Sequence, residues 1–338
     1  MKSILPIVIL TLAACSGKDS DTGVDDTGVS GDCDVTVDET IPAANATDAY
    51  YRNAIEFKLS DPDATAVLSV DGVDGTSTLS EDQETVVFTP SSPLSSSTAY
   101  TATLDYCRSE PASIGFTTSE LGGSVDPSSL IGRAYALDLS SGRIVIPEGV
   151  GEILGAYLEY TIFLSVTDAG SDLSMIGALA NEDDTSAQDY CAPTLDFPVA
   201  DFSEAPYFQI GPETTTLAVA GFAITIDDLL VSGDFAPDGT WVGGAQLAGS
   251  IDTRPLVALL DDDPEAGEDT VCELVAGFGV ECIPCSDGDS FCLDLLVLDL
   301  VAEEAGGLAV EEIAAEDCHA SCPDSVSNPE CPEFYTGK

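Results

Sequence analysis

Apolar side chains recur at every second position in several short stretches of this chain. In one of them Ile55, Phe57 and Leu59 alternate with Glu56 and Lys58. A period of two places alternate side chains on one face of a β-strand, and Gly and Pro residues separate such stretches at turn-like intervals. The sequence therefore predicts an all-β protein. Similar stretches lie at 100–106 and 158–166.

The segment 33–119 has the length and strand spacing of one β-sandwich. The run VFTPSSPL at 87–94, followed by AYTATL at 99–104, resembles the SbsA-type bacterial Ig-like domain, and Pro42 and residues 55–57 fall where that family places its early strands. The resemblance implies a spacer, adhesive or cell-surface module without catalytic residues.

Two finer expectations concern this first domain. Tyr100 is placed to act as a tyrosine corner, in which a hydroxyl ties a loop back to the sheet. Cys33 and Cys107 are the two cysteines of the segment, and we expect them to pair across the sandwich.

A Gly-, Ser- and Pro-containing linker at 120–129 leads to a larger region, 130–335, which resembles no family. We expect a β-sandwich or open barrel with one or two short helices, one of them beginning at Asp252 or Thr253 with Pro255 in its first turn. The turn residues 236–239 predict a hairpin. Expected strands cover 217–226, 229–235, 241–251 and, at the centre of the sheet, 293–301.

Cysteines are the second constraint on this region. In an exported protein they predict disulfides, whose connectivity the sequence leaves open, with stapled loops at 272–292 and 318–331. Zinc or redox chemistry at the CxxC pair of Cys282 and Cys285 is the less favoured alternative. The eight cysteines are Cys191, Cys272, Cys282, Cys285, Cys292, Cys318, Cys322 and Cys331.

Acidic clusters offer weak candidates for calcium ligands, and otherwise no cofactor is expected. Asp287 and Asp289, and likewise Asp261 and Asp263, are spaced as loop carboxylates that could bind Ca²⁺. A chain with 61 Asp and Glu residues contains such clusters by chance.

The amino terminus predicts export and anchorage. Residues 1–14 combine a positive start, a short apolar run and small residues, as in a secretory signal peptide, and the run LAAC ending at Cys15 resembles the bacterial lipobox. The resemblance implies acylation of Cys15, insertion of its acyl chains in a lipid bilayer and, with Ser16 next, sorting to the outer membrane, on its periplasmic or cell-surface face. Residues 16–32, rich in Asp, Gly, Ser and Thr, are expected to form a flexible tether.

The charge of the chain excludes some partners. Nine Lys and Arg against 61 Asp and Glu give a formal net charge of −52, which repels the phosphate backbone of nucleic acid. Motifs of serine hydrolases, zinc proteases and P-loop enzymes are missing, and the chain has one His. We therefore expect no enzymatic activity.

Three functions remain open at this point. The favoured one is a non-enzymatic outer-membrane lipoprotein whose Ig-like spacer presents the second domain for adhesion, or for binding a surface protein, matrix or small ligand. The alternatives are a carrier of an apolar small ligand and a carboxylate-dependent hydrolase. A cavity lined by Leu, Ile and Val would favour the carrier, whereas paired ionisable groups in a cleft would favour the hydrolase.

Overall fold

The computed structural model describes residues 33–147, 161–181, 183–219, 222–257, 267–314 and 322. Its strands pair in antiparallel ladders, which confirms the expected all-β class. The strands are β1 (Val37–Ile41), β2 (Ile55–Leu59), β3 (Val67–Val70), β4 (Gly75–Leu79), β5 (Thr85–Pro90), β6 (Ala99–Asp105), β7 (Ala112–Thr117), β8 (Ala134–Asp138), β9 (Arg143–Ile146), β10 (Thr161–Ala169), β11 (Asp172–Leu179), β12 (Leu195–Asp196), β13 (Ala200–Asp201), β14 (Tyr207–Val219), β15 (Phe222–Phe235), β16 (Trp241–Asp252) and β17 (Cys292–Glu304). The helices are 3₁₀ turns at Pro127–Ser129, Leu139–Ser141 and Arg254–Leu256, and α3 (Thr270–Ala276).

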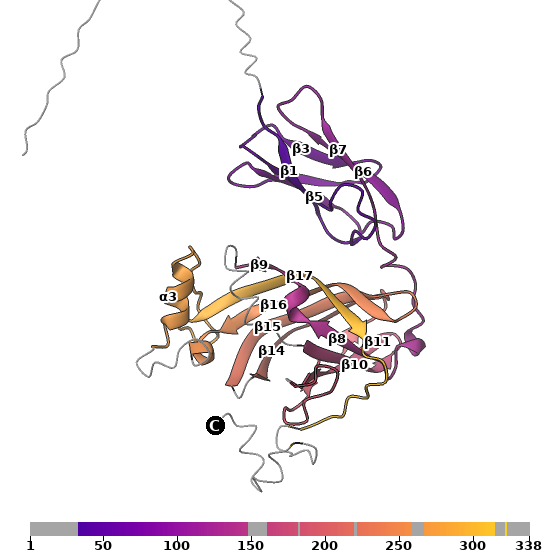
Figure 1. Cartoon of the computed structure of the whole chain (residues 1–338), viewed down its shortest axis with the longest axis vertical. Coiled ribbons are helices and arrows are strands. Elements are labelled where there is room, and N and C mark those ends of the chain that lie inside the picture. Colours follow the sequence, from indigo (N-terminus) through magenta and orange to yellow (C-terminus); the bar gives the residue numbers. More distant parts are fainter. Residues whose placement is uncertain are drawn as a thin grey trace, which may run out of the picture. The chain divides into compact units, whose positions relative to one another are not determined.

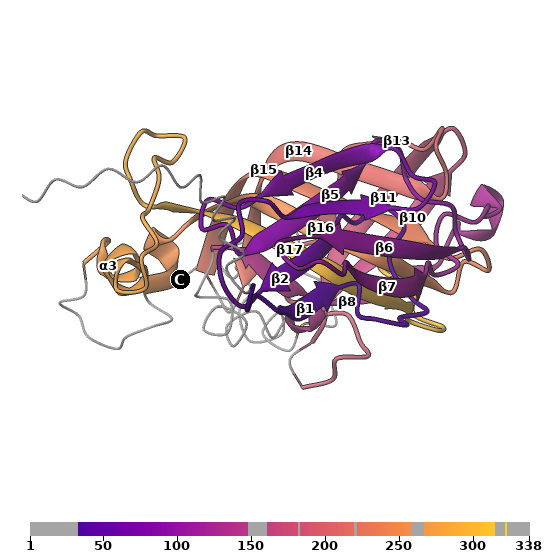
Figure 2. The same cartoon turned by 90° about the horizontal axis from the view of Figure 1, so that it is seen from above.

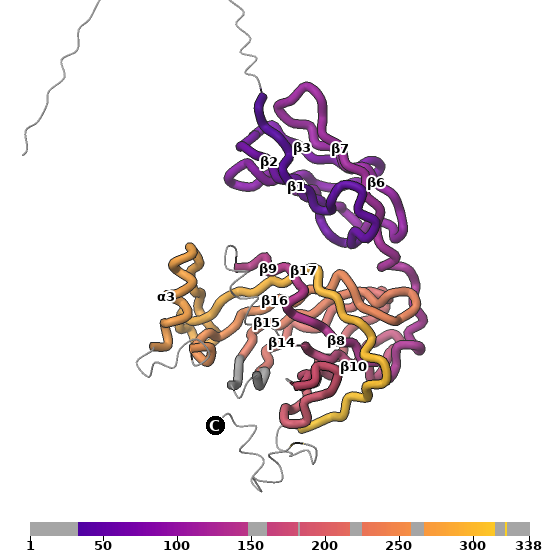
Figure 3. Tube along the Cα trace, viewed as in Figure 1, coloured from indigo at the N-terminus to yellow at the C-terminus, as the bar shows by residue number. Residues whose placement is uncertain are grey.

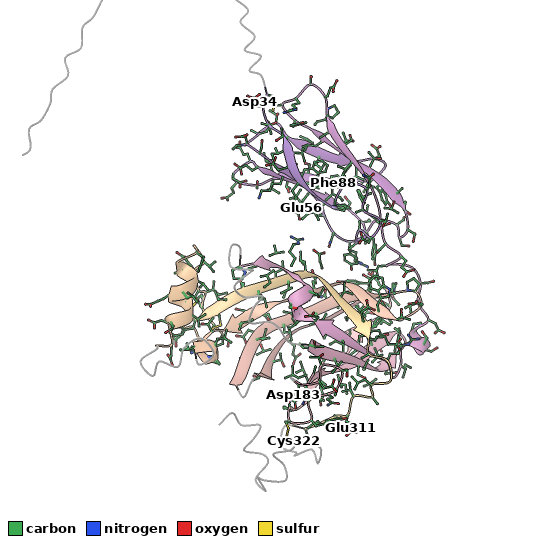
Figure 4. All side chains as sticks on the ribbon, in the orientation of Figure 1. Asp34, Glu56, Phe88, Asp183, Glu311 and Cys322 are labelled. Carbon is green, nitrogen blue, oxygen red and sulfur yellow. A yellow bond between two sulfur atoms is a disulfide. The ribbon has the colours of Figure 1, made fainter. Side chains whose placement is uncertain are left out.

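The first seven strands form the expected Ig-like sandwich. One sheet has the order β1-β2-β5-β4 and the other β3-β6-β7. Alternate residues of β2 and β6 face the opposing sheet, so that Phe57 and Leu104 are fully buried. Figure 4 labels Phe88 of β5 inside this sandwich, where it is 4% exposed.

Tyr100 ties a loop to this sandwich as expected of a tyrosine corner. Its hydroxyl accepts a hydrogen bond of 2.9 Å from the backbone N–H of Ser95. Its ring stacks on Phe116 of the neighbouring strand β7, with 5.8 Å between the ring centroids. The residue therefore fixes both the loop before β6 and the packing of that sheet.

The second domain is one ten-stranded antiparallel sheet that curls into a half-barrel (Figure 1). The main path runs β12-β11-β10-β8-β17-β16-β15-β14, while β13 pairs with β11 and β9 with β17. Of the two expected architectures, the open barrel is thus the correct one. The expected hairpin is β15–β16, and the expected central strand lies within β17, between β16 and β8.

Bulges in the ladders account for the curl of this sheet. The register shifts in each of the pairs β14–β15, β15–β16 and β16–β17. Asp228, Gly244 and Asp299 adopt positive φ angles of 52°, 55° and 60°. An extra residue on one strand bends that strand and increases its twist, so repeated bulges turn a flat sheet into a curved one.

One expected strand is wrong. Residues 217–226 do not form a single strand, because β14 ends at Val219 and β15 begins at Phe222, with these two residues paired in the ladder. Both arms of the hairpin are apolar near its turn, and the sequence between them holds Gly221 but no Pro, Asn or Asp. The apolar run therefore concealed the reversal of the chain.

The helix expected at Asp252 or Thr253 can be followed only at its start. Residues Arg254–Leu256 form a 3₁₀ turn, Val257 is helical, and residues 258–266 lie outside the described part. The Thr253 hydroxyl donates to the Phe291 carbonyl and does not cap the turn. Helix α3 was not predicted, although Val271 and Val275, four residues apart, form its buried face. Figure 2 shows α3 and its loops beyond the ends of β16 and β17. Within the described residues no helix has the length and apolar character needed to span a bilayer.

Candidate functional site

Among the described residues, three disulfides staple the second domain. Cys272 pairs with Cys282 and Cys285 with Cys292, which makes 272–292 a stapled loop region as expected. Cys322 does not staple a local loop; it pairs with Cys191, 131 residues away. Cys33 and Cys107 are both disulfide-bonded. Cys15, Cys318 and Cys331 lie outside the described residues.

The structure gives the metal and redox alternatives no support at the positions it describes. Cys282 and Cys285 are each bonded to a different cysteine, so they form neither a zinc pair nor a redox pair with one another. Asp287 forms an ion pair of 2.7 Å with Arg254.

No three His, Cys, Asp or Glu side chains of the described residues gather closely enough to hold a metal ion. Asp261 and Asp263 lie outside the described part.

The concave side of the curled sheet contains an apolar pocket. Its volume is about 70 Å³, and it is partly open to solvent. Both edges of the sheet contribute, since Leu195 comes from β12 and Thr216 from β14. The curl therefore brings strands from opposite ends of the sheet order around one space. The lining residues are Leu137, Ile162, Leu164, Gly177, Ala178, Leu179, Pro193, Thr194, Leu195, Phe197, Thr216, Ile226, Leu229, Val231 and Leu247.

An aromatic cluster of Tyr135, Phe202, Phe208 and Phe235 fills the neighbouring part of the same concave face. The ring of Phe235 lies 5.1 to 5.8 Å from the other three ring centroids. All four side chains are at most 1% exposed. On β8, β14 and β15 the aromatic residue stands towards one end of the strand and the pocket residues towards the other. The half-barrel is thus filled at the aromatic end and hollow beyond it.

The polar atoms of the pocket already have partners in the protein. The Thr194 hydroxyl accepts from the backbone N–H of Ile313 at 3.0 Å. The Thr216 hydroxyl lies 3.3 Å from that of Thr225, and the rest of the lining is aliphatic, aromatic or glycine. No ionisable side chain is among the lining residues. The pocket can therefore exclude water and hold apolar groups, but it offers no acid–base pair.

One wall of the pocket is held by the segment 305–314, which follows β17. Gln188 donates to the Glu311 carbonyl at 2.8 Å and accepts from the Glu311 N–H at 2.9 Å. The Thr194 N–H bonds to the Ile313 carbonyl at 2.9 Å. Figure 3 shows this segment beside the loop after β11, and Figure 4 labels Glu311 and Cys322 there. These bonds and the Cys191–Cys322 disulfide fix the loop that supplies Pro193, Thr194 and Leu195.

A buried carboxylate lies outside the pocket, where the Ig-like domain contacts β15. Asp234 is fully buried and accepts hydrogen bonds from the hydroxyls of Tyr50 and of Tyr51, the latter at 2.8 Å. Arg52 donates to the Tyr51 hydroxyl at 2.8 Å, and its guanidinium lies 3.8 Å from the centre of the Tyr207 ring.

Burial sets the ionisation of this cluster. It raises the pKa of Asp234 above its ordinary value, and the bonds from the tyrosines and the charge of Arg52 oppose that rise only in part. Burial, together with the Asp234 charge, also raises the pKa of Tyr51 to about 12 and that of Tyr50 further. Asp234 is the one described carboxylate whose pKa is raised, and it binds tyrosines. The cluster therefore joins two domains and does not resemble a catalytic pair.

The sequence predicted which strand faces are apolar, but it did not predict that these faces enclose a pocket. The alternation of apolar and polar residues predicts that Ile162 and Leu164 lie on the same apolar face of a strand. Nothing local indicates that Leu195 and Ile226 converge, because the curl depends on bulges spread over several ladders. Gly244 is one example: its φ is positive, and a Cβ at this position would collide with the Tyr50 ring, which lies far away in the sequence.

Comparisons with known proteins define only the first domain. Residues 32–118 match the family model of the bacterial Ig-like domain, which confirms the resemblance carried by the VFTPSSPL run. No curated protein sequence matches the chain.

Likenesses among solved structures are slight. An L,D-transpeptidase from Mycobacterium smegmatis is 14% identical, with 46% of this chain and 84% of that chain covered and a TM-score of 0.23. The N-terminal part of the bacterial S-layer protein SbsC is 11% identical, with 40% of each chain covered and a TM-score of 0.19. At these TM-scores neither likeness carries an argument about function.

Proposed function

We propose that this chain is an exported, membrane-anchored binding protein without enzymatic activity, whose half-barrel domain holds an apolar small ligand. The observation that carries the proposal is the apolar pocket, framed by residues from both edges of the curled sheet. Ligand sites of proteins are characteristically concave and mostly apolar. In a protein that bound only through its outer surface, the concave face would be expected to be filled throughout, as it is at the aromatic cluster.

The rest of the chain supports export and display. A bacterial Ig-like domain and several disulfides indicate an exported or cell-surface protein. Acylation of Cys15 would anchor it to the outer membrane, and residues 16–32 would serve as a tether. In this proposal the Ig-like domain is a spacer, joined to the half-barrel through Tyr50, Tyr51 and Asp234.

Adhesion or partner binding remains a second candidate, and one observation favours it. Leu274 and Phe278, four residues apart at α3, are 44% and 51% exposed. Exposed large apolar side chains are typical of contact surfaces when they form a patch. The Cys272–Cys282 disulfide beside them would hold such a surface in place.

Thermal unfolding in the presence of apolar compounds tests the main proposal. The chain from Ser16 onward, exported behind a signal peptide without a lipobox cysteine, avoids the need for detergent. A ligand that binds only the folded state stabilises it by about 2.7 kcal/mol at one hundred times its Kd. We expect a higher Tm with at least one compound of a panel containing monolauroylglycerol, lauric acid, dodecane and naphthalene. An unchanged Tm with all four would refute the carrier function.

A further inference from the structure

We infer that the pocket takes the end of a single unbranched hydrocarbon chain whose head group carries no negative charge, an inference that rests on the function proposed above. The size of the pocket is the first reason. An engineered cavity that holds one benzene molecule measures about 150 Å³. The present pocket, at about 70 Å³, has room for a narrow chain end but not for a ring.

The side chains around the pocket determine how deep the chain can reach. Leu137, Leu164, Leu229 and Val231 are at most 6% exposed and form its floor. Beyond them the aromatic cluster closes the half-barrel. A ligand must therefore enter from the opposite side, past the half-buried residues Pro193 to Leu195, with its chain end inside and its head outside.

The hydroxyls of the lining give no reason for a polar group to enter. Those of Thr194 and Thr216 are already bonded to protein groups. A polar group carried into the pocket would lose its bonds to water without replacement, which is costly. The part of the ligand inside must therefore be hydrocarbon only.

The charge outside the pocket selects the head group. The three arginines after residue 119 are all ion-paired with carboxylates: Arg133 with Glu304, Arg143 with Asp299 and Arg254 with Asp252 and Asp287. Each of these arginines already has a carboxylate partner in the protein, so none is left to bind a ligand carboxylate. The chain as a whole has a formal net charge of −52. Repulsion of like charges disfavours an anionic head, so a neutral one, as in an acylglycerol or a fatty alcohol, is the better fit.

Calorimetric titration with three compounds tests this inference. Monolauroylglycerol and lauric acid share one chain and differ in head-group charge, while naphthalene is an uncharged ring. At pH 8 and low salt we expect monolauroylglycerol to bind roughly tenfold more tightly than laurate, and naphthalene not to bind. Equal affinities for the ester and the acid, or binding of naphthalene, would overturn the inference but leave the carrier function standing. If none of the three compounds binds, the inference and the carrier function are both overturned.

Two substitutions locate the binding event. Ala178→Phe places a ring in the pocket from β11 and is expected to abolish monolauroylglycerol binding, whereas Val301→Phe, at a residue of β17 that is 38% exposed, is expected to leave it unchanged. Leu247→Ala enlarges the pocket and is expected to admit naphthalene, so a failure of the Ala178 variant to fold does not end the test. Unchanged binding in folded Ala178→Phe protein, or exclusion of naphthalene by Leu247→Ala, would contradict this location.

Discussion

Asp234 shows how one residue can join two domains. Its carboxylate is withdrawn from water and binds two tyrosine hydroxyls from the Ig-like domain. In the sequence it is one of three Asp residues in β15, and nothing near it indicates its partners, which lie more than 180 residues away. The role of Asp234 could not be predicted, because it depends on contacts between domains.

Asp234→Ala should destabilise the chain, because two buried hydroxyls lose their acceptor. Each unsatisfied buried donor costs about 1–3 kcal/mol, so we expect a loss of about 2–6 kcal/mol for the two hydroxyls. Asp234→Asn keeps an acceptor and should cost less. Urea unfolding measures both values. A loss of stability in the Asn variant as large as in the Ala variant would contradict the role of the acceptor.

Acid pH should increase the difference in unfolding free energy between the wild type and the Asp234→Asn variant. The folded-state pKa of Asp234 is raised above the ordinary value of 3.8, so its contribution to stability is full below that value and is lost as the pH rises through the folded pKa. We therefore expect the stability of the wild type, relative to the Asn variant, to increase as the pH falls towards 3.8. A difference between the two unfolding free energies that stays constant or shrinks would count against a raised pKa of Asp234 in the folded state.

Alkaline pH should weaken the same contact through Tyr51. Its folded-state pKa is raised from 10.0 to about 12, so the stability that its neutral form provides is full below pH 10 and is lost as the pH rises towards 12. Tyr51→Phe should be less stable than the wild type at pH 8, but it should lose less stability between pH 10 and about 12. Parallel unfolding curves of the two proteins across the interval would disprove the assignment.

The disulfides act on whole elements, and they do so unequally. Cys191–Cys322 closes a loop of 131 residues, whereas Cys285–Cys292 closes one of 7. In the chain-entropy account these bridges contribute about 5 and 2.5 kcal/mol. We expect Cys191→Ser/Cys322→Ser to lower Tm more than Cys285→Ser/Cys292→Ser, measured by calorimetry. The first variant should also release ligand faster, because the Cys191–Cys322 disulfide holds one wall of the pocket. Equal effects of the two variants on Tm and on ligand release would contradict this unequal contribution.

Elements were predictable where local chemistry decided them. The β15–β16 hairpin was found because Pro237, Asp238 and Gly239 mark its turn, and Gly239 has a φ of 71°. The β14–β15 hairpin was missed because its turn lies in an apolar run. Helix α3 was missed because seven residues with two buried valines give a weak periodic signal.

At the scale of the molecule, the sequence predicted the Ig-like domain, whereas for the second domain it left a sandwich and an open barrel as alternatives. The first carries a family pattern in 87–94 and 99–104, confirmed by the match over 32–118. The second depends on a curl distributed over bulges such as that at Gly244. Its all-β class, most of its strands and the presence of disulfides followed from the sequence, whereas the β14–β15 hairpin, the disulfide connectivity and the pocket required the structure.

The net charge of −52 predicts a stability that rises with salt. Like charges repel in the compact state, and salt screens them over a Debye length of about 10 Å at 0.1 M. We expect Tm to increase from 10 mM to 300 mM NaCl, and equally in KCl, because screening does not depend on the identity of the cation. A falling Tm would show that attractive ion pairs dominate instead.

The central claim is that an apolar chain binds on the concave side of the half-barrel. Its most direct test is nuclear Overhauser spectroscopy of the methyl-labelled protein with monolauroylglycerol. The account predicts contacts between the terminal methyl group of the chain and the methyl groups of Leu164, Leu229 and Leu247. Contacts at Leu274 alone, or none with the half-barrel, would contradict it.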